Sequence, residues 1–136
     1  HEDHIGALSY ILREINIPIY ATKLTMGIIE KKLTEHNLLR STRRKVVKHG
    51  QSINLGQFRI EFIKTNHSIQ DAAALAIYSP AGIVVHTGDF KVDYTPVFGD
   101  AIDLQRFAEI GKKEYWHFCQ TVPMQNEKAL HSLNVR

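Results

Sequence analysis

Three stretches of the chain carry apolar side chains at helical spacing. In the first, over residues 3–15, the apolar positions are Ile5, Leu8, Ile11, Leu12 and Ile15. The second covers residues 22–36, with Thr22 as N-cap and an expected apolar face of Leu24, Ile28, Ile29 and Leu33. The third runs over residues 103–110, with Asp103 as N-cap and Gly111 after its end. Each stretch therefore predicts an amphipathic helix that packs on a core.

Short runs rich in β-branched and aromatic residues separate these helices. They predict strands at residues 18–21, 45–48, 57–63, 72–78 and 82–86. The turn Ser79-Pro80-Ala81-Gly82 would join the last two strands as a hairpin. Helices that alternate with strands in this way are typical of an α/β fold.

Composition adds modest constraints to this picture. The 136 residues are 43% hydrophobic, which suffices for one core, and carry a formal charge of +3. One basic stretch contains Arg40, Arg43, Arg44, Lys45, Lys48 and His49. Such a stretch suits contact with a phosphate backbone, and a solvated basic face that includes the histidine is the default alternative. No run is long and apolar enough to span a membrane, and the single cysteine fits a reducing cytoplasm.

Three segments offer side chains that could bind a metal ion. They are the opening His1-Glu2-Asp3-His4, then Asn66-His67-Ser68, then Thr87-Gly88-Asp89. Imidazole and carboxylate are ligands that suit Zn²⁺ and similar cations. Each group also has an ordinary explanation, as a helix N-cap, a solvated loop histidine and a turn aspartate respectively. The metal interpretation is favoured because all three segments fall at a helix start or at strand ends, where rigid elements can aim side chains at one point.

These segments resemble the motifs of a known superfamily. His1-Glu2-Asp3-His4-Ile5-Gly6-Ala7 resembles the second half of the His-x-His-x-Asp-His motif of the metallo-β-lactamase superfamily. Residues 66–71 resemble its third motif in the nucleic-acid-processing branch, and residues 86–93 resemble its fourth. Together with the hairpin Pro80-Ala81-Gly82, they are most similar to the ribonuclease J family, which carries an inserted β-CASP domain. The resemblance extends from residue 1 to about residue 113.

The resemblance implies a role for five residues. His1 and His67 would bind one divalent cation, Asp3 and His4 a second, and Asp89 would bridge both. The expected cations are zinc, with manganese as the alternative, and the nucleophile would be a hydroxide held by the metals.

Residues beside these ligands have weaker assignments. Ser68 and Asp71 would orient the imidazoles or simply cap their loop, and Glu2 would point away from the site.

Relative to the family pattern, parts of the enzyme are missing. The first histidine of the opening motif would stand two positions before His1, and the N-terminal strands and the β-CASP domain have no counterpart. Residues 1–113 are thus expected to form a partial metallo-β-lactamase αββα sandwich that folds marginally. Such a fragment would bind one metal ion weakly or none and would be inactive.

The last segment, residues 114–136, shows no regular periodicity. Back-translated with one added G before Glu114, it reads Gly-Val-Leu-Ala-Leu-Leu-Ser-Asp-Ser-Thr-Asn, the strand and polar turn that the family pattern requires. We therefore interpret it as a frameshifted tail, which leaves His117, Cys119 and His131 without a functional role.

The intact protein is expected to hydrolyse RNA phosphodiester bonds. By the resemblance it would act as a 5′–3′ exonuclease, an endonuclease or both, in the processing of RNA, ribosomal RNA included, and in RNA decay. It would form a homodimer or homotetramer in the cytoplasm. Two alternatives remain open: a small-molecule hydrolase of the same fold that acts on thioesters or lactones, and an RNA-binding fragment without catalysis.

Overall fold

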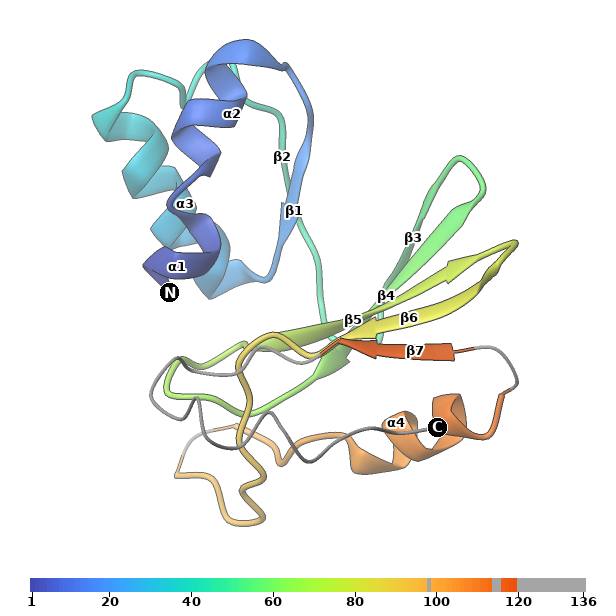
Figure 1. Cartoon of the computed structure of the whole chain (residues 1–136). Helices are drawn as coiled ribbons and strands as arrows, with labels where there is room; N and C mark the ends of the chain where they lie inside the picture. The colour runs from blue at the N-terminus through green and yellow to red at the C-terminus, as the bar shows by residue number, and fades with distance from the viewer. Residues whose placement is uncertain (98, 114–115, 120–136) are drawn as a thin grey trace, which may run out of the picture.

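The computed structural model describes residues 1–97, 99–113 and 116–119. Its elements in chain order are α1 (Glu2–Ile5), α2 (Leu8–Glu14), β1 (Ile19–Ala21), α3 (Lys23–Glu35), β2 (Arg44–Val46), β3 (Ser52–Leu55), β4 (Phe58–Lys64), β5 (Ala73–Ser79), β6 (Gly82–His86), α4 (Leu104–Gly111) and β7 (Trp116–Cys119). Figure 1 shows two bodies, a helical body made of α1 to β2 and a sheet body made of β3 to β7 with α4. The fold is mixed α/β, as predicted.

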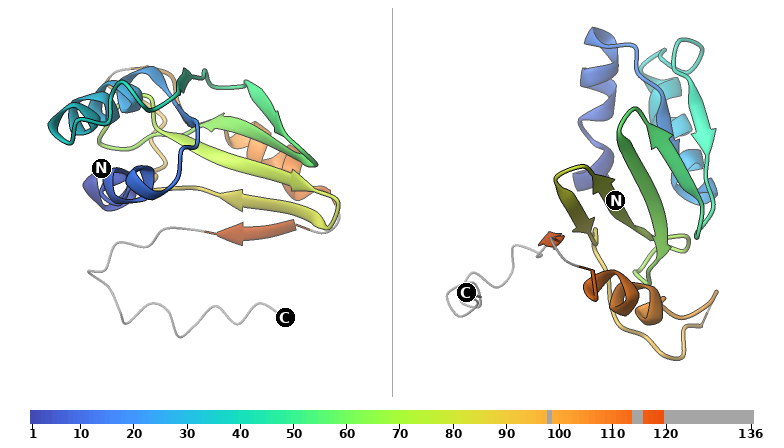
Figure 2. Two further views of the ribbon diagram at one scale, coloured as in Figure 1. Left: turned by 90° about the horizontal axis from the view of Figure 1, so that it is seen from above. Right: turned by 90° about the vertical axis from the view of Figure 1, so that its right-hand side faces the viewer.

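The helical body is built around one β-α-β crossover. Strands β1 and β2 pair in parallel, and α3 connects them. Helices α1 and α2 pack against α3, as the two views of Figure 2 show. The buried apolar core of this body comprises Ile5, Ile19, Ala21, Met26, Ile29 and Leu33. Burial of these side chains, rather than the short two-stranded sheet, stabilises the helical body.

Two predictions for this body need correction. The single helix expected over residues 3–15 is interrupted after Ile5, and Asp3 lies in the first turn of α1 without capping it. On α3, Leu24 and Ile28 are not part of the core, since 42% and 39% of their surface is exposed. Met26 belongs to the core instead, because it packs with Ile5 of α1 and Ile19 of β1.

The sheet body contains a five-stranded sheet in the order β3-β4-β5-β6-β7. Its strands are antiparallel except for the parallel pair β6 and β7. Strand β3 was not predicted, and it pairs with β4 across a two-residue turn in which Gly56 has a φ of 60°. Helix α4 covers one face of this sheet in Figure 1 and buries Ile110 among sheet residues Ile63, Ala74, Ala76, Ile83 and Val85.

Helix α4 begins as predicted. The Asp103 side chain accepts a hydrogen bond from the backbone N–H of Arg106 at 3.0 Å, which caps the helix.

A polar cluster also joins α4 to the sheet. The Arg106 guanidinium donates to both carboxylate oxygens of Glu61, at 2.6 and 2.9 Å, and the Tyr78 hydroxyl donates to the same carboxylate at 2.9 Å. The Glu61 side chain is only 8% exposed. The hydrogen bonds from Arg106 hold the pKa of the Glu61 carboxyl below its ordinary value, although burial acts in the opposite direction. This buried charge is therefore stable because it is paired.

The segment expected to lack regular structure contains a strand. Residues 116–119 form β7 and continue the sheet beside β6, so the expectation of no strand is wrong at these positions. Without β7, β6 would be the edge strand of the sheet. The unpaired backbone groups of an edge strand can form hydrogen bonds with another extended segment. The remaining positions of the segment, residues 114–115 and 120–136 with His131, lie outside the described residues. The frameshift therefore stays a prediction.

Among the described residues, no helix has both the length and the apolar character needed to cross a membrane.

Candidate metal centre

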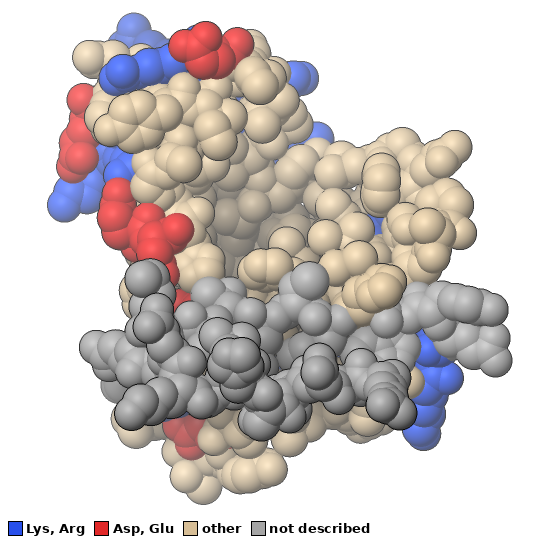
Figure 3. Space-filling view, in the orientation of Figure 1, with Lys and Arg blue, Asp and Glu red and all other residues tan. Residues whose placement is uncertain are grey.

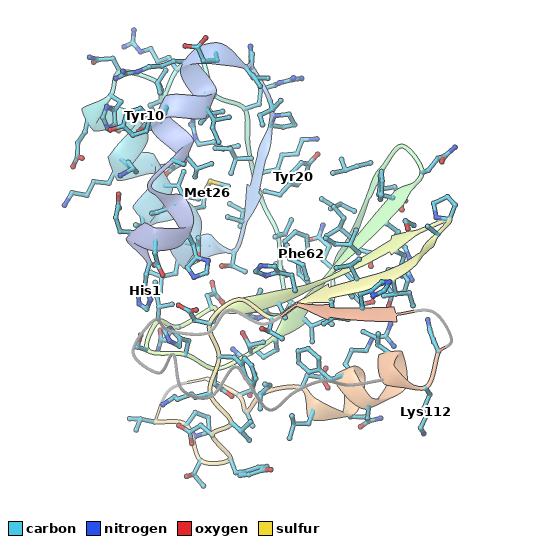
Figure 4. The ribbon with its side chains drawn as sticks, viewed as in Figure 1. His1, Tyr10, Tyr20, Met26, Phe62 and Lys112 are labelled. Carbon is cyan, nitrogen blue, oxygen red and sulfur yellow. The ribbon has the colours of Figure 1, made fainter. Side chains whose placement is uncertain are left out.

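The three predicted ligand segments meet where the two bodies face each other. His1, Asp3 and His4 lie at the start of α1 in the helical body, while His67 and Asp89 lie on loops that follow β4 and β6. In Figure 4, His1 stands at the lower end of the helical body, directly above the loops of the sheet body. The site is thus shared between the two bodies by residues that are far apart in sequence.

The ligand atoms form two groups that share one carboxylate. His1, His67 and Asp89 form one group, and Asp3, His4 and Asp89 form the other. Within each group the ligand atoms lie within 4.8 Å of one another. All five predicted ligands are therefore brought together, and their role as ligands remains a prediction.

Direct contacts bind the two bodies at this point. Nε2 of His4 lies 3.2 Å from Oδ2 of Asp89 and 3.6 Å from Oδ2 of Asp3. The rings of His1 and His67 meet edge to face, with 4.9 Å between their centroids. Polar and ring contacts thus already orient the donors toward one another.

Ser68 joins the two imidazoles of the first group. Its hydroxyl lies 3.1 Å from Nε2 of His1 and 3.2 Å from Nδ1 of His67, within hydrogen-bond distance of both rings. Of the two interpretations for Ser68, these contacts favour the one in which it orients the imidazoles, and that role stays a prediction. Glu2 points away from the site, as expected, and pairs with Lys32 on α3.

The loop that carries His67 is tied to the loop that follows Asp89. The carbonyl of Asn66 accepts the N–H of Lys91 at 2.7 Å, and the Asn66 amide donates to the carbonyl of Asp100 at 3.0 Å. These bonds hold the third and fourth motif segments side by side. The backbone bond between Asn66 and Lys91 thus helps to fix the spacing of His67 and Asp89.

The same loop is attached at its other end to the helical body. Asp71 adopts a φ of 67°, and its carboxylate accepts the N–H of Leu24 in the first turn of α3 at 3.3 Å. His49 donates from Nε2 to the carbonyl of Ala72 at 3.0 Å, and its Nδ1 lies 4.0 Å from the Asp71 carboxylate. The prediction that His49 is solvated is therefore wrong. No local pattern marks this contact, because its partners are separated by more than twenty residues.

The turn after β6 places Asp89. Gly88 has a φ of 59°, a conformation that residues with a side chain rarely adopt, and its N–H donates to Nδ1 of His86 at 3.1 Å. His86 thus supports the turn without belonging to either ligand group. His117 also belongs to neither ligand group.

The basic stretch has a partly structural use. The Arg44 guanidinium donates to Glu30 at 3.0 Å and to the carbonyls of Leu39 and Thr42, so it fastens β2 to α3. Lys45 donates to the Tyr20 hydroxyl at 3.2 Å. Arg44 is therefore committed to structural contacts, whereas Lys45 remains exposed.

The donor set fits a pair of divalent cations. Three imidazoles and two carboxylates are ligands for Zn²⁺ or Mn²⁺, and a carboxylate common to both groups is the donor that can bridge two ions. Asp89 is the less exposed of the contacting pair, with 18% of its side chain exposed against 34% for His4. A cavity of about 340 Å³ lies beside His67 and Ser68, and Lys64 and Lys91 are among its lining residues.

Comparison with known proteins gives this site a family. The chain is 45% identical over 115 residues to ribonuclease J of a Synechocystis species, and 46% identical over 114 residues to ribonuclease J of Helicobacter pylori. Each alignment covers 83% of this chain but only 18% and 16% of the relative.

No protein-family model matches the chain. Among solved structures, the metallo-beta-lactamase fold protein YhfI from Bacillus subtilis aligns with a TM-score of 0.47 and 27% identity, over 64% of this chain and 35% of YhfI. The sequence relatives are the informative comparison, since their identity extends over most of the chain. On that identity, this chain belongs to the ribonuclease J family.

Proposed function

We propose that this chain supplies most of the two-metal centre of an RNA phosphodiester hydrolase. The observation that carries the proposal is the position of Asp89, whose carboxylate lies within both ligand groups. Two cations bound there would supply a strongly acidified water as nucleophile and would stabilise the charge that develops on the phosphate. The substrate class is inferred from the relatives, which are named as ribonucleases.

In this proposal, the residues of the chain divide the work between the two bodies. His1 and His67 would hold one cation, and Asp3 and His4 would hold the other. Asp89, which belongs to both ligand groups, would balance part of their charge. Ser68 orients the two imidazoles through its hydroxyl. We expect zinc as the physiological ion, with manganese as the alternative.

Basic residues beside the ligands favour an anionic substrate. Lys64 and Lys91 line the cavity next to His67. Lys91 pairs with Asp93 at 3.0 Å, so part of its charge is already balanced, whereas no ion pair involves Lys64 among the described residues. Of these two lysines, Lys64 is therefore better placed to attract a phosphate group of the RNA.

The proposal concerns a protein longer than this chain. Because the chain spans less than a fifth of the relatives, we propose that it acts within a protein of their length and that the isolated chain is inactive. Within that protein, we infer a nuclease of RNA processing and decay in the cytoplasm, acting from the 5′ end, internally or both, and assembled as a dimer or tetramer.

The test is the substitution Asp89→Ala in the full-length gene product, cloned through both ends of this sequence. We expect cleavage of an end-labelled RNA to be abolished, because the carboxylate common to both ligand groups is lost. Glu2→Ala is the control, since Glu2 lies next to the ligands in sequence but pairs with Lys32. A wild-type cleavage rate in the Asp89 variant would overturn the proposal.

A further inference from the structure

A groove runs along α3 beside the candidate metal centre. It has a volume of about 660 Å³ and lies between one face of α3 and the loop that carries His67. The lining residues used below are Lys23, Leu24, Gly27, Ile28 and Lys31 of α3, together with Asp71 of the loop. His67 and Asp71 are four positions apart in the sequence, so one end of the groove lies close to the site.

The apolar part of this groove is an exposed second stripe on α3. The helix buries Met26, Ile29 and Leu33 in the helical body. Leu24 and Ile28 lie on a different face and keep 42% and 39% of their surface exposed. Apolar side chains that are exposed together along one helix face are typical of a contact site.

Lysines flank the stripe at both ends. Lys23 and Lys31 are eight residues apart, about 12 Å along a helix. Neither forms an ion pair with another described residue, in contrast to Lys32, which pairs with Glu2. The one lining carboxylate, Asp71, is already occupied by the Leu24 N–H and the nearby His49 ring. The groove is therefore complementary to a negatively charged occupant with apolar surfaces.

The floor of the groove is helix backbone. A Cβ atom added at Gly27 would meet no other atom within 4 Å, so the space above it is open. An occupant can consequently approach α3 closely at this position.

We propose that this groove holds a single-stranded segment of RNA next to the bond that is cleaved. Phosphates would contact Lys23 and Lys31, and bases would lie against the apolar side chains of Leu24 and Ile28. A cationic groove that follows the backbone is the usual means of binding single strands without sequence preference, although the base contacts here would be aliphatic and not aromatic. The inference rests on the proposed function, since it deepens that function by assigning the path of the substrate. A protein segment with an apolar, uncharged surface is the competing occupant.

The experiment measures binding of a fluorescein-labelled oligouridine to the full chain by fluorescence anisotropy, with EDTA present so that neither metal binding nor cleavage contributes. For Lys23→Gln combined with Lys31→Gln, we expect about tenfold weaker binding at moderate salt. The slope of log affinity against log salt should fall by about 1.4, as expected for two lost phosphate contacts on a single strand. The control is the pair Lys112→Gln and Lys113→Gln after α4, which removes the same charge elsewhere.

A second variant keeps the charge and fills the groove. Gly27→Leu should weaken RNA binding several-fold while the thermal midpoint stays equal or rises, because the new side chain meets open space and leucine favours helix. Gly111→Leu at the end of α4, where an added Cβ also meets nothing, is the matched control.

The outcomes of the binding experiments test the groove independently of the cleavage reaction. Equal loss of affinity in the groove and control lysine pairs would show general charge attraction and would overturn the proposal. So would undiminished RNA binding by Gly27→Leu, which would leave the groove to an uncharged protein segment. These binding measurements contain no metal, so their result is independent of the cleavage test. The groove proposal can be overturned while Asp89→Ala still abolishes cleavage, and it can be supported even if Asp89→Ala leaves cleavage intact.

Discussion

The two bodies of the molecule are stabilised in different ways. The helical body depends on apolar burial around Leu33, which is fully buried, and its sheet has only two short strands. The sheet body adds a buried ion pair between Glu61 and Arg106, which are 45 residues apart. Figure 3 shows a hollow between the bodies, lined mainly by uncharged side chains. The candidate site takes ligands from both bodies, so its polar contacts also connect them.

The largest expected effect comes from breaking the ion pair that is specific to the sheet body. Glu61→Ala should lower the free energy of unfolding by about 3 kcal/mol, because the Arg106 charge loses its partner. We expect a value at the low end of the range for buried pairs, since 29% of the Arg106 side chain is exposed. Urea unfolding followed by circular dichroism measures this change. Replacing both residues, as Glu61→Leu with Arg106→Met, should cost less, and an equal cost would contradict the role of the pair.

The same pair should make the sheet body sensitive to acid. Because the folded pKa of Glu61 is lowered, the stability that the ionised carboxylate contributes is complete above its unfolded pKa of about 4.5. It is lost as the pH falls below that value through the folded pKa. Glu61→Gln should therefore show a flatter decrease of stability between about pH 5 and pH 3 than the unaltered chain.

The second expected effect is stabilisation by zinc, whose candidate ligands come from both bodies. Zinc at a hundredfold excess over its dissociation constant should raise the free energy of unfolding by about 2.7 kcal/mol, because the ligands from both bodies assemble only in the folded chain. Thermal unfolding with and without zinc measures this gain. Asp89→Asn should remove most of it, whereas Asp93→Asn, outside the ligand groups, should not. Equal stabilisation of both variants would contradict the assigned ligands.

A smaller effect should follow from detaching the His67 loop from α3. Asp71→Ala removes the carboxylate that accepts the Leu24 N–H and places alanine at a positive φ, which together should cost about 2 kcal/mol. Asp71→Asn keeps an acceptor and tolerates this φ, so it should retain most of the stability.

Zinc affinity distinguishes a positioning role of Asp71 from a purely structural one. If Asp71 positions His67, titration calorimetry should show at least roughly tenfold weaker zinc binding for Asp71→Ala and near-normal binding for Asp71→Asn. Unchanged zinc affinity in Asp71→Ala would limit the residue to fold stability.

Most of the elements could be predicted from local patterns. The helix at residues 104–111 could be predicted from its N-cap. The Asp103 side chain accepts a hydrogen bond from the N–H of Arg106, three positions later, so this contact depends only on nearby residues. The hairpin of β5 and β6 follows from two apolar runs around a short turn. Strand β3 was missed because its run Ser52-Ile53-Asn54-Leu55 is too short to establish a periodicity, and its pairing with β4 makes it a strand.

The candidate ligands were predicted from the sequence motifs, whereas the contacts that hold the ligand loops in place were not. The five candidate ligands could be named because each motif is a short run of adjacent residues. The contacts of His49 with Ala72 and of Asp71 with Leu24 join positions 23 and 47 residues apart, and no periodicity reports such pairs.

By itself, the amino-acid sequence determined the types and approximate bounds of most elements, the candidate ligands and the family resemblance, because periodicity, caps and motifs are properties of neighbouring residues. Only the tertiary structure decided that Ser68 contacts both His1 and His67, that Glu61 is buried against Arg106, and that Leu24 and Ile28 line a groove. These outcomes depend on which faces of distant elements meet. Packing the whole chain selects that arrangement, and no single segment encodes it.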